Sequence, residues 1–265
     1  MQHEAFDGVV IRARQTGDHD VVLSILTADT GRISVLSKGS KSLKGEQRSI
    51  SQLFTHANFE VYRRGDMYIL KGGSPLHTFY GISNDIARFS LASYLCDIAY
   101  ELTDEGEPAD AVMRLLLNAL YAVSENLYPM ETVKGAFELR AAILSGYTPD
   151  LSGCAECGTD VAEELYLDVM NGAILCSACL RSRSSRAKNV GTYDEIREAE
   201  VLSPITPSVL AAIRYVATAP LARLFSFELK DTDEGTAFAS CAERYLLSHL
   251  GHGFATLDFY RSMRD

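Results

Sequence analysis

The chain has 265 residues, of which 47% are hydrophobic and 23% charged, enough for a buried core and ordinary for a folded protein. No apolar run approaches the roughly eighteen residues that a membrane-spanning helix needs, and the first residues lack the basic start and apolar stretch of a secretory signal. We therefore expect a cytoplasmic protein whose thiols are reduced and available to bind metal.

The net charge of −10 argues at first against a nucleic-acid partner, but the charge is unevenly distributed. Residues 1–80 hold ten Lys or Arg and eight Asp or Glu, a net of +2, whereas the remaining residues carry a net of −12. Because binding depends on the local field, which decays over about 10 Å at moderate salt, a basic face can operate on an acidic protein. A chance difference between the two parts of the chain is the alternative.

Alternating side chains predict a β-rich segment over the first 76 residues. The strand-like runs are 6–16, 21–25, 33–35, 51–62 and 67–71. A turn signal, Asp29-Thr30-Gly31, separates two of them, and a polar, glycine-containing loop follows at 38–45. Five strands with no helical segment between them favour a small closed barrel, because closure removes exposed sheet edges.

From Gly81 onward the apolar residues recur at helical spacing. Segments expected to be helical run from 81 to a break at 106–108, from 108 to about 127, from 130 to 145, from 207 to 218 and from 235 to 250. A loop-rich segment of cysteines and basic residues lies between these helices. We therefore expect a barrel domain at 1–80, a helical domain at 81–150 and 190–265, and a metal-binding insertion at 151–189.

Two cysteine pairs, C-A-E-C and C-S-A-C, are separated by eighteen residues. Each pair can chelate one edge of a metal, and together they give a tetrahedral four-thiolate shell that zinc favours and that leaves no position open for substrate. The predicted ligands of one structural zinc ion per chain are Cys154, Cys157, Cys176 and Cys179. A disulfide pair and an iron–sulfur cluster are the alternatives. The other two cysteines, Cys96 and Cys241, lie on apolar helical stripes and are expected to be core thiols.

Basic residues gather on the predicted barrel. Those on the outward phase of their strands are Arg12, Arg14, Arg32 and Lys38, and those in the adjoining loop are Lys41, Lys44 and Arg48. Such clusters bind phosphate backbones, and small barrels often bind single strands by combining a basic groove with aromatic stacking. The available aromatic residues are Phe54, Phe59, Tyr62 and Tyr68. A solvated charged face without function is the alternative interpretation.

Several short motifs resemble those of a known family. V-V-I-R-A-R-Q-T-G-D-H-D at 9–20, L-T-A-D-T-G-R-I-S-V at 26–35 and K-G-S-K at 38–41 are similar to the N-terminal barrel of the RecO recombination mediators. F-E-L-R at 137–140 and L-S-G-Y at 144–147 precede the first cysteine pair as they do in zinc-containing members. L-D-F-Y at 257–260 is similar to the family's apolar ending. The resemblance covers nearly the whole chain and depends on the order and spacing of the motifs.

The resemblance implies an α+β protein with an N-terminal OB-fold barrel, followed by a helical bundle domain with an inserted four-cysteine zinc finger. It implies a non-enzymatic, nucleoid-associated role in DNA repair. Family members bind single- and double-stranded DNA, anneal complementary strands and, with RecR, help load RecA onto single strands coated by the single-stranded-DNA-binding protein. The DNA contacts it implies here are Arg14, Arg32, Lys38, Lys41, Lys44 and Arg48. The acidic overall charge departs from the family pattern.

Arg140 shares a helical stripe with Phe137. An Arg beside an apolar groove suits an acidic, aromatic-ended peptide, such as the tail of the single-stranded-DNA-binding protein, which family members bind. The alternative is an Arg whose stem packs while its head reaches water or Glu138. A second basic run follows the zinc cysteines, with Arg181, Arg183, Arg186 and Lys188, and is expected to be a loop that makes a secondary contact to phosphate.

Two other function classes compete with the mediator. One is a zinc-ribbon regulatory factor that binds RNA or protein. The other is an accessory enzyme of a nuclease or ligase with a hidden carboxylate metal site. No G-x-x-x-x-G-K-[ST] loop is present, so ATP hydrolysis by that route is not expected.

Overall fold

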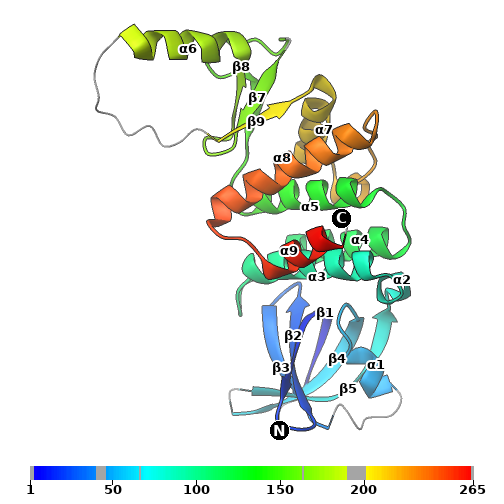
Figure 1. Ribbon diagram of the computed structural model, residues 1–265. Helices are drawn as coiled ribbons and strands as arrows, with labels where there is room; N and C mark the ends of the chain where they lie inside the picture. The colour runs from blue at the N-terminus through cyan, green and yellow to red at the C-terminus, as the bar shows by residue number, and fades with distance from the viewer. Residues whose placement is uncertain (1–2, 40–45, 66, 163, 190–200, 264–265) are drawn as a thin grey trace. The chain divides into compact units, whose positions relative to one another are not determined.

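The computed structural model describes residues 3–39, 46–65, 67–162, 164–189 and 201–263 (Figure 1). The chain forms two compact units, one made of Met1–Met130 with Phe254–Asp265 and the other of Glu131–Gly253. The predicted α+β class, with an N-terminal barrel, helices after it and a four-cysteine cluster, is confirmed. The three-part domain division expected from the sequence stays a prediction.

Five strands close into a barrel in the order β1-β2-β3-β5-β4. They are β1 (His3–Thr16), β2 (Asp20–Thr27), β3 (Gly31–Ser37), β4 (His56–Arg64) and β5 (Met67–His77). The long β1 pairs with β4 through its first half and with β2 through its second half. Closure comes from a short parallel pairing of Val35 and Leu36 with Tyr68 and Ile69. Alternate side chains fill the interior, which leaves the outer surface of the barrel for polar and basic residues.

The strand expected to begin at Ser51 is wrong in its first part. Helix α1 (Glu46–Ile50) and a turn occupy this region, and β4 begins only at His56. Ile50 and Phe54 are both buried and lie four residues apart, a spacing that suits a helical turn better than alternation. Phe54, with φ of 68°, donates its N–H to the Val10 carbonyl over 2.9 Å.

Four helices complete the first unit, namely α2 (Tyr80–Ser83), α3 (Ile86–Glu101), α4 (Asp110–Ser124) and α9 (Ala255–Ser262). Helix α3 is buried on most of its circumference, as its apolar residues predict, and it is capped by the preceding Asp85, whose carboxylate accepts hydrogen bonds from the N–H groups of Ala87 and Arg88. Helices α3 and α4 lie against the barrel, and α9 packs along α3 (Figure 1).

The turn between β2 and β3 is joined to the loop between α3 and α4. Gly31 has φ of 66°, and a Cβ at this position would lie only 2.1 Å from the Asp104 carbonyl oxygen. The Arg32 N–H donates to that same carbonyl over 3.1 Å, and the Gly106 N–H donates to Thr30 over 2.9 Å. Only glycine permits this close approach, so the first residue of β3 fixes the helices to the barrel.

The second unit combines helices with a small sheet. Its helices are α5 (Met130–Leu144), α6 (Ser177–Asn189), α7 (Pro207–Thr218), the short 3₁₀ helix η1 (Leu221–Arg223) and α8 (Thr232–Leu250). The strands β6 (Asp150–Cys154), β7 (Leu165–Asp168), β8 (Ala173–Cys176) and β9 (Leu202–Ile205) pair in the order β6-β8-β7-β9. Gly135 lets α5 approach α8 closely, since a Cβ there would lie 2.7 Å from the Phe238 ring.

Helix α6 corrects one expectation, because the basic run after the zinc cysteines is helical and not a loop. The expectation failed because the run has no apolar stripe, which is the main sequence signal of a helix. None of the helices in the described ranges combines the length and the apolarity needed to cross a bilayer.

Candidate functional site

The four cysteines predicted from spacing come together at one point of the second unit. Their Sγ atoms all lie within 4.8 Å of one another, and the Sγ atoms of Cys157 and Cys176 are 3.8 Å apart. A tetrahedral ion with Zn–S bonds of about 2.3 Å requires S···S edges of about 3.8 Å. The donor set therefore fits a four-coordinate metal ion of the size of zinc.

Backbone hydrogen bonds shape the segment that carries the first cysteine pair. The Cys154 N–H donates to the Thr159 carbonyl and the Gly158 N–H donates to the Cys154 carbonyl, both over 2.7 Å. Gly158 has φ of 75°, which glycine adopts without strain. These bonds fold residues 154–159 into a tight turn, here called the zinc knuckle. The turn brings the Sγ atoms of Cys154 and Cys157 to the same point.

Hydrogen bonding prepares Cys154 to be a thiolate ligand. Burial opposes its charge, but hydrogen bonds from the backbone at Cys157, Cys176 and Glu156 outweigh burial and lower the pKa of Cys154 to about 6. The core thiols behave in the opposite way, because burial raises the pKa of Cys241 to about 11. Cys96 and Cys241 are both about 1% exposed, which confirms them as core residues.

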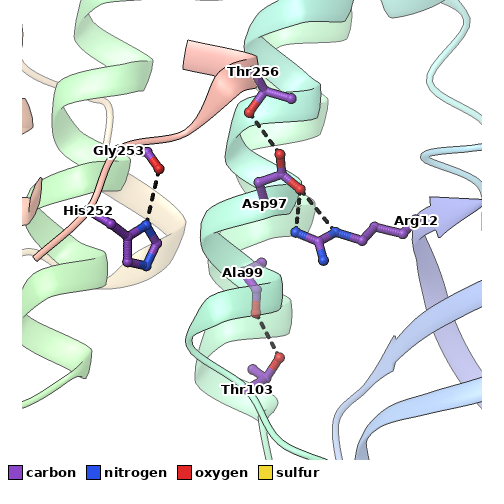
Figure 2. A network of polar contacts seen from close by, with 7 residues as sticks. All are labelled: Arg12, Asp97, Ala99, Thr103, His252, Gly253 and Thr256. Carbon is purple, nitrogen blue, oxygen red and sulfur yellow. Dashed lines mark hydrogen bonds and ion pairs between the residues drawn. The ribbon is translucent and has the colours of Figure 1, made fainter. Parts of the chain in front are cut away.

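Two of the predicted DNA contacts, Arg12 and Arg32, are bound to partners within the first unit, and their side chains are 42% and 16% exposed. The Arg12 guanidinium donates to Asp97 Oδ1 from Nε over 3.0 Å and from Nη2 over 2.7 Å, while Thr256 Oγ1 donates to Asp97 Oδ2 over 2.8 Å (Figure 2). The guanidinium carbons of Arg12 and Arg32 lie 3.5 and 3.8 Å from the centroid of the Tyr100 ring. Arg12 thus links β1, through one carboxylate, to α3 and α9.

Arg32 has little freedom to leave its position. Its Nε donates to the Thr103 carbonyl, its Nη2 lies 3.3 Å from Asp104 Oδ1, and its side chain is only 16% exposed. The geometry assigns both arginines a part in holding the barrel to the helices through cation–π and ion-pair contacts. Their contact with DNA stays a prediction.

Arg14 and Lys38 are placed differently. Both are exposed, and neither forms an ion pair with any residue in the described part of the chain. Arg14 lies directly opposite Val22, which lies opposite Leu36 on β3, and Lys38 follows Leu36 by two residues. The Gly39 N–H donates to Asp20 Oδ1 over 2.8 Å, which fixes the turn carrying Lys38 to the start of β2.

Two further cations lie on the last two strands. Leu36 pairs with Ile69 on β5, and Ile69 pairs with Tyr62 on β4. Alternate residues share a face, so Lys71 and Arg64 project outward as well, but they lie two residues to opposite sides of the Ile69–Tyr62 pair, and Ile69 itself is only 4% exposed. Both are exposed. We call the set Arg14, Lys38, Tyr62, Arg64 and Lys71 the barrel face.

Arg64 and Lys71 are not among the contacts predicted from the sequence. Arg64 lies two residues after Tyr62, and Lys71 lies two residues after Ile69. The alternation of residues along each strand was therefore the only sequence signal that could have located them. Of the remaining predicted contacts, Arg48 is exposed on α1, whereas Lys41 and Lys44 lie outside the described residues.

Comparison with known proteins shows the family of this chain. Residues 1–79 match the family model described as Recombination protein O N terminal, and residues 83–258 match the model described as Recombination protein O C terminal. The chain belongs to the RecO family. RecO proteins are DNA repair proteins, and the two matches together cover the barrel and nearly all that follows it.

Curated relatives are similar along most of their length, and each carries the name DNA repair protein RecO. The relative from Acetivibrio thermocellus is 28% identical over 266 residues, which is 99% of this chain and 98% of the relative. The relative from Rubrobacter xylanophilus is 29% identical over 220 residues, covering 83% and 82%. The relative from Anaeromyxobacter dehalogenans is 31% identical over 182 residues, covering 68% and 71%.

In this RecO chain, the residues considered for binding a protein tail have internal roles. Phe137 is 0% exposed, so its ring offers no surface to a peptide in this conformation. The Arg140 Nη2 donates to the carbonyl of Ala219 over 2.6 Å and to that of Val216, which are acceptors at the C-terminal end of α7. A cation at this end of a helix stabilises it. Burial lowers the pKa of Arg140, and its binding of a tail stays a prediction.

A buried charge cluster that the sequence did not predict lies between α5 and α8. Lys134 Nζ is 2.7 Å from Glu138 Oε1 and 2.7 Å from Glu243 Oε2. The Lys134 side chain is 3% exposed and that of Glu138 is 0% exposed. A Lys and a Glu four residues apart usually mark a solvated helix face, so local spacing offers no reason to place them in the core of this RecO protein.

Acid is expected to weaken the second unit through His249. Its ring stacks on Tyr147 with centroids 4.2 Å apart and lies edge-on to Tyr245 at 4.6 Å. Its Nε2 is buried without a hydrogen-bond partner among the described residues, and burial lowers the pKa of His249. The unfolded chain therefore binds this proton more readily, so the contribution to stability holds above about pH 6.5 and declines as pH falls below it.

The measurement is the melting temperature at pH 7.5 and pH 5.5 for the wild type and for His249→Phe, which keeps an aromatic ring in the stack. We expect the melting temperature of the variant to fall less over this interval. Equal losses in the two proteins would show that His249 does not contribute to the acid sensitivity.

Proposed function

We propose that this RecO chain is a recombination mediator that binds single-stranded DNA across the barrel face and anneals complementary strands. The observation that carries the proposal is that the basic residues of the barrel differ in whether other residues of the chain bind them. Arg12 and Arg32 are held by Tyr100, Asp97 and Asp104, whereas Arg14 on β1 and Lys38 just after β3 are exposed and form no ion pair with any residue in the described ranges. Exposed cations that are not engaged by carboxylates suit a phosphate backbone.

Tyr62 gives this surface an aromatic component. It is half-buried on β4, two residues before the exposed Arg64, and its ring centroid lies 6.4 Å from that of His3. Base stacking on such a ring is tolerant of sequence and adds about 1–3 kcal/mol per base. Exposed cations together with an aromatic residue on the outer strands therefore favour an unpaired strand, whose bases are free to stack, over a duplex.

The metal proposed for the four-cysteine site is one structural zinc ion. Four thiolates at tetrahedral spacing satisfy its coordination, so no ligand position is left for a reacting group. We propose a structural role, in which the ion holds together four strands of only four or five residues each. Cys154, Cys157, Cys176 and Cys179 hold it.

Membership of the RecO family supports a more specific proposal about the partners of this chain. The partners are RecR and the acidic tail of the single-stranded-DNA-binding protein, and the outcome is loading of RecA onto coated single strands. The double-stranded form of DNA is expected to bind more weakly than the single strand, because its bases cannot stack on Tyr62.

Strand annealing tests the proposal. We expect Arg14→Glu/Lys38→Glu to slow the annealing of two complementary oligonucleotides at least tenfold, because it places two like charges against the phosphate backbone. The control is Arg114→Glu/Arg223→Glu, which changes the net charge equally at exposed positions outside the barrel strands. Equal rates for the two variants would contradict the assignment of the barrel face, and a preference for RNA strands would favour a zinc-ribbon regulatory factor instead.

A further inference from the structure

The four proposed zinc ligands differ in their access to solvent. Cys154 and Cys176 are 2% and 3% exposed, and Cys179 is half-buried in the first turn of α6. Cys157, on the zinc knuckle, is exposed. The reactivity of a cysteine toward an oxidant in solution follows its thiolate character and its exposure. Because all four ligands are thiolates when they hold a metal ion, exposure is what distinguishes Cys157 from the other three.

Hydrogen bonding distinguishes the same sulfur atom. The Cys176 N–H lies 3.4 Å from Cys154 Sγ, and the Cys179 N–H lies 3.5 Å from Cys176 Sγ. Among the residues that the structure describes, no backbone N–H donates to Cys157 Sγ. A hydrogen bond to sulfur draws electron density from it and makes it a weaker nucleophile. Cys157 therefore combines exposure with a sulfur atom that backbone hydrogen bonds do not weaken as a nucleophile.

A second cysteine lies within reach of Cys157. The Sγ atom of Cys157 is 3.8 Å from that of Cys176, the last residue of β8. Strand β8 pairs with both β6 and β7, so Cys176 is held in the middle of the small sheet, whereas Cys157 lies in an exposed turn. A sulfenic acid formed at Cys157 would therefore lie beside a thiolate that can condense with it.

We propose that Cys157 is the site at which hydrogen peroxide oxidises this protein, with Cys176 as the cysteine that forms a disulfide with it. This inference rests on the proposed zinc site, to which it adds a second property. Disulfide formation removes two of the four ligands, and Cys154 and Cys179 alone cannot complete a tetrahedral shell. Since the shell holds the small sheet together, oxidation releases the metal ion and loosens the sheet.

The reaction has two steps. The Cys157 thiolate attacks one oxygen of the peroxide, the O–O bond breaks, and a sulfenic acid and a hydroxide ion form. The Cys176 thiolate then attacks the Cys157 sulfur, an S–S bond forms, the S–O bond breaks, and a second hydroxide ion leaves. The two sulfur atoms together lose two electrons, which the peroxide gains, and two protons from the solvent convert both hydroxide ions to water.

The first test uses the full chain loaded with zinc. It is treated with hydrogen peroxide while a chromophoric chelator reports the released metal, and the peptides are then mapped by mass spectrometry. We expect release of about one zinc ion per chain together with a Cys157–Cys176 disulfide. Dimedone, which traps sulfenic acids, is expected to label Cys157. Zinc that stays bound, or a disulfide between other cysteines, would overturn the oxidation site and leave the zinc site intact. A chain that binds no zinc before treatment would contradict both.

Two matched variants test the choice of Cys157 over its neighbour. Cys157→His and Cys179→His each keep a zinc ligand at the substituted position, because zinc accepts three thiolates and one imidazole. We expect peroxide to release zinc from the Cys157 variant about tenfold more slowly than from the wild type. The Cys179 variant is expected to stay within about twofold of the wild-type rate. Equal rates in the two variants would overturn the assignment to Cys157, and the peptide mapping of the wild type does not depend on how either variant folds.

Discussion

Replacing Lys134 by Met is expected to lower the free energy of unfolding by about 3–5 kcal/mol, the range found when one partner of a buried ion pair is removed. Lys134 supplies the cation for two carboxylates, at 2.7 Å from each. One of them belongs to Glu138, which is 0% exposed, so the loss leaves a charge in the core without its counter-ion. The measurement is urea unfolding followed by circular dichroism.

Two further variants separate the charge effect from packing. Lys134→Met/Glu138→Leu removes both members of the fully buried pair, and we expect it to recover most of the lost stability, because apolar residues of similar volume often replace a buried pair without loss. Lys230→Met removes an exposed cation and is expected to change stability by less than about 0.5 kcal/mol. A single Lys134 variant as stable as the Lys230 control would contradict this account of the cluster.

Removal of the metal is expected to unfold the small sheet of the second unit. The four strands there have four or five residues each, and structural zinc in short peptides contributes about 10–16 kcal/mol of apparent binding energy at neutral pH. We expect about one zinc per chain in the purified protein by elemental analysis. We expect Cys176→Ser to lose the metal and to become sensitive to protease between residues 150 and 205.

The barrel provides an internal control for this experiment, since it belongs to the other compact unit and is expected to stay protected. Cys96→Ala is the matched variant, because it removes a buried thiol that is not a ligand and should retain the metal. Iron in place of zinc would contradict the identity of the metal. A Cys176 variant that lacks metal but resists protease in this region would contradict its structural role.

Local patterns were sufficient to predict most of the fold. Alternation over β1 to β5 indicated the barrel, and the two cysteine pairs indicated a cluster whose sulfur atoms all lie within 4.8 Å. The helix expected at 207–218 was also correct at both ends, because Thr206 caps it and Pro207 occupies its first turn. Each of these signals lies within a few residues of the structure that it predicts.

The errors arose where distant contacts decide the outcome. Arg12 and Asp97 are 85 residues apart, so the outward phase of β1 could not reveal that Arg12 is held by α3. The alternation is correct there, but the outer surface of the barrel is partly covered by the helices that follow it. The sequence therefore predicted the outward direction of Arg12, Arg14 and Arg32 without showing which of them the helices bind.

The helix α6 and the Lys134 cluster escaped detection for related reasons. α6 begins beside two cysteine ligands and has no apolar stripe, so its residues show no helical period. Lys134 and Glu138 have the spacing of a surface pair, and only the approach of α8 at Gly135 places them in the interior. In both cases the residues that determine the local structure lie in another segment of the chain, and local sequence patterns do not link the two segments.

The salt dependence of single-strand binding tests the barrel face most directly, because it reports how many phosphate groups the bound protein neutralises. Each neutralised phosphate adds about 0.7 to the slope of log K against log salt concentration for a single strand. We predict that Arg14→Gln/Lys38→Gln reduces the magnitude of this slope by about 1.4 relative to the wild type. An unchanged slope in the folded variant would show that neither residue meets a phosphate group, and the proposed DNA surface would be wrong.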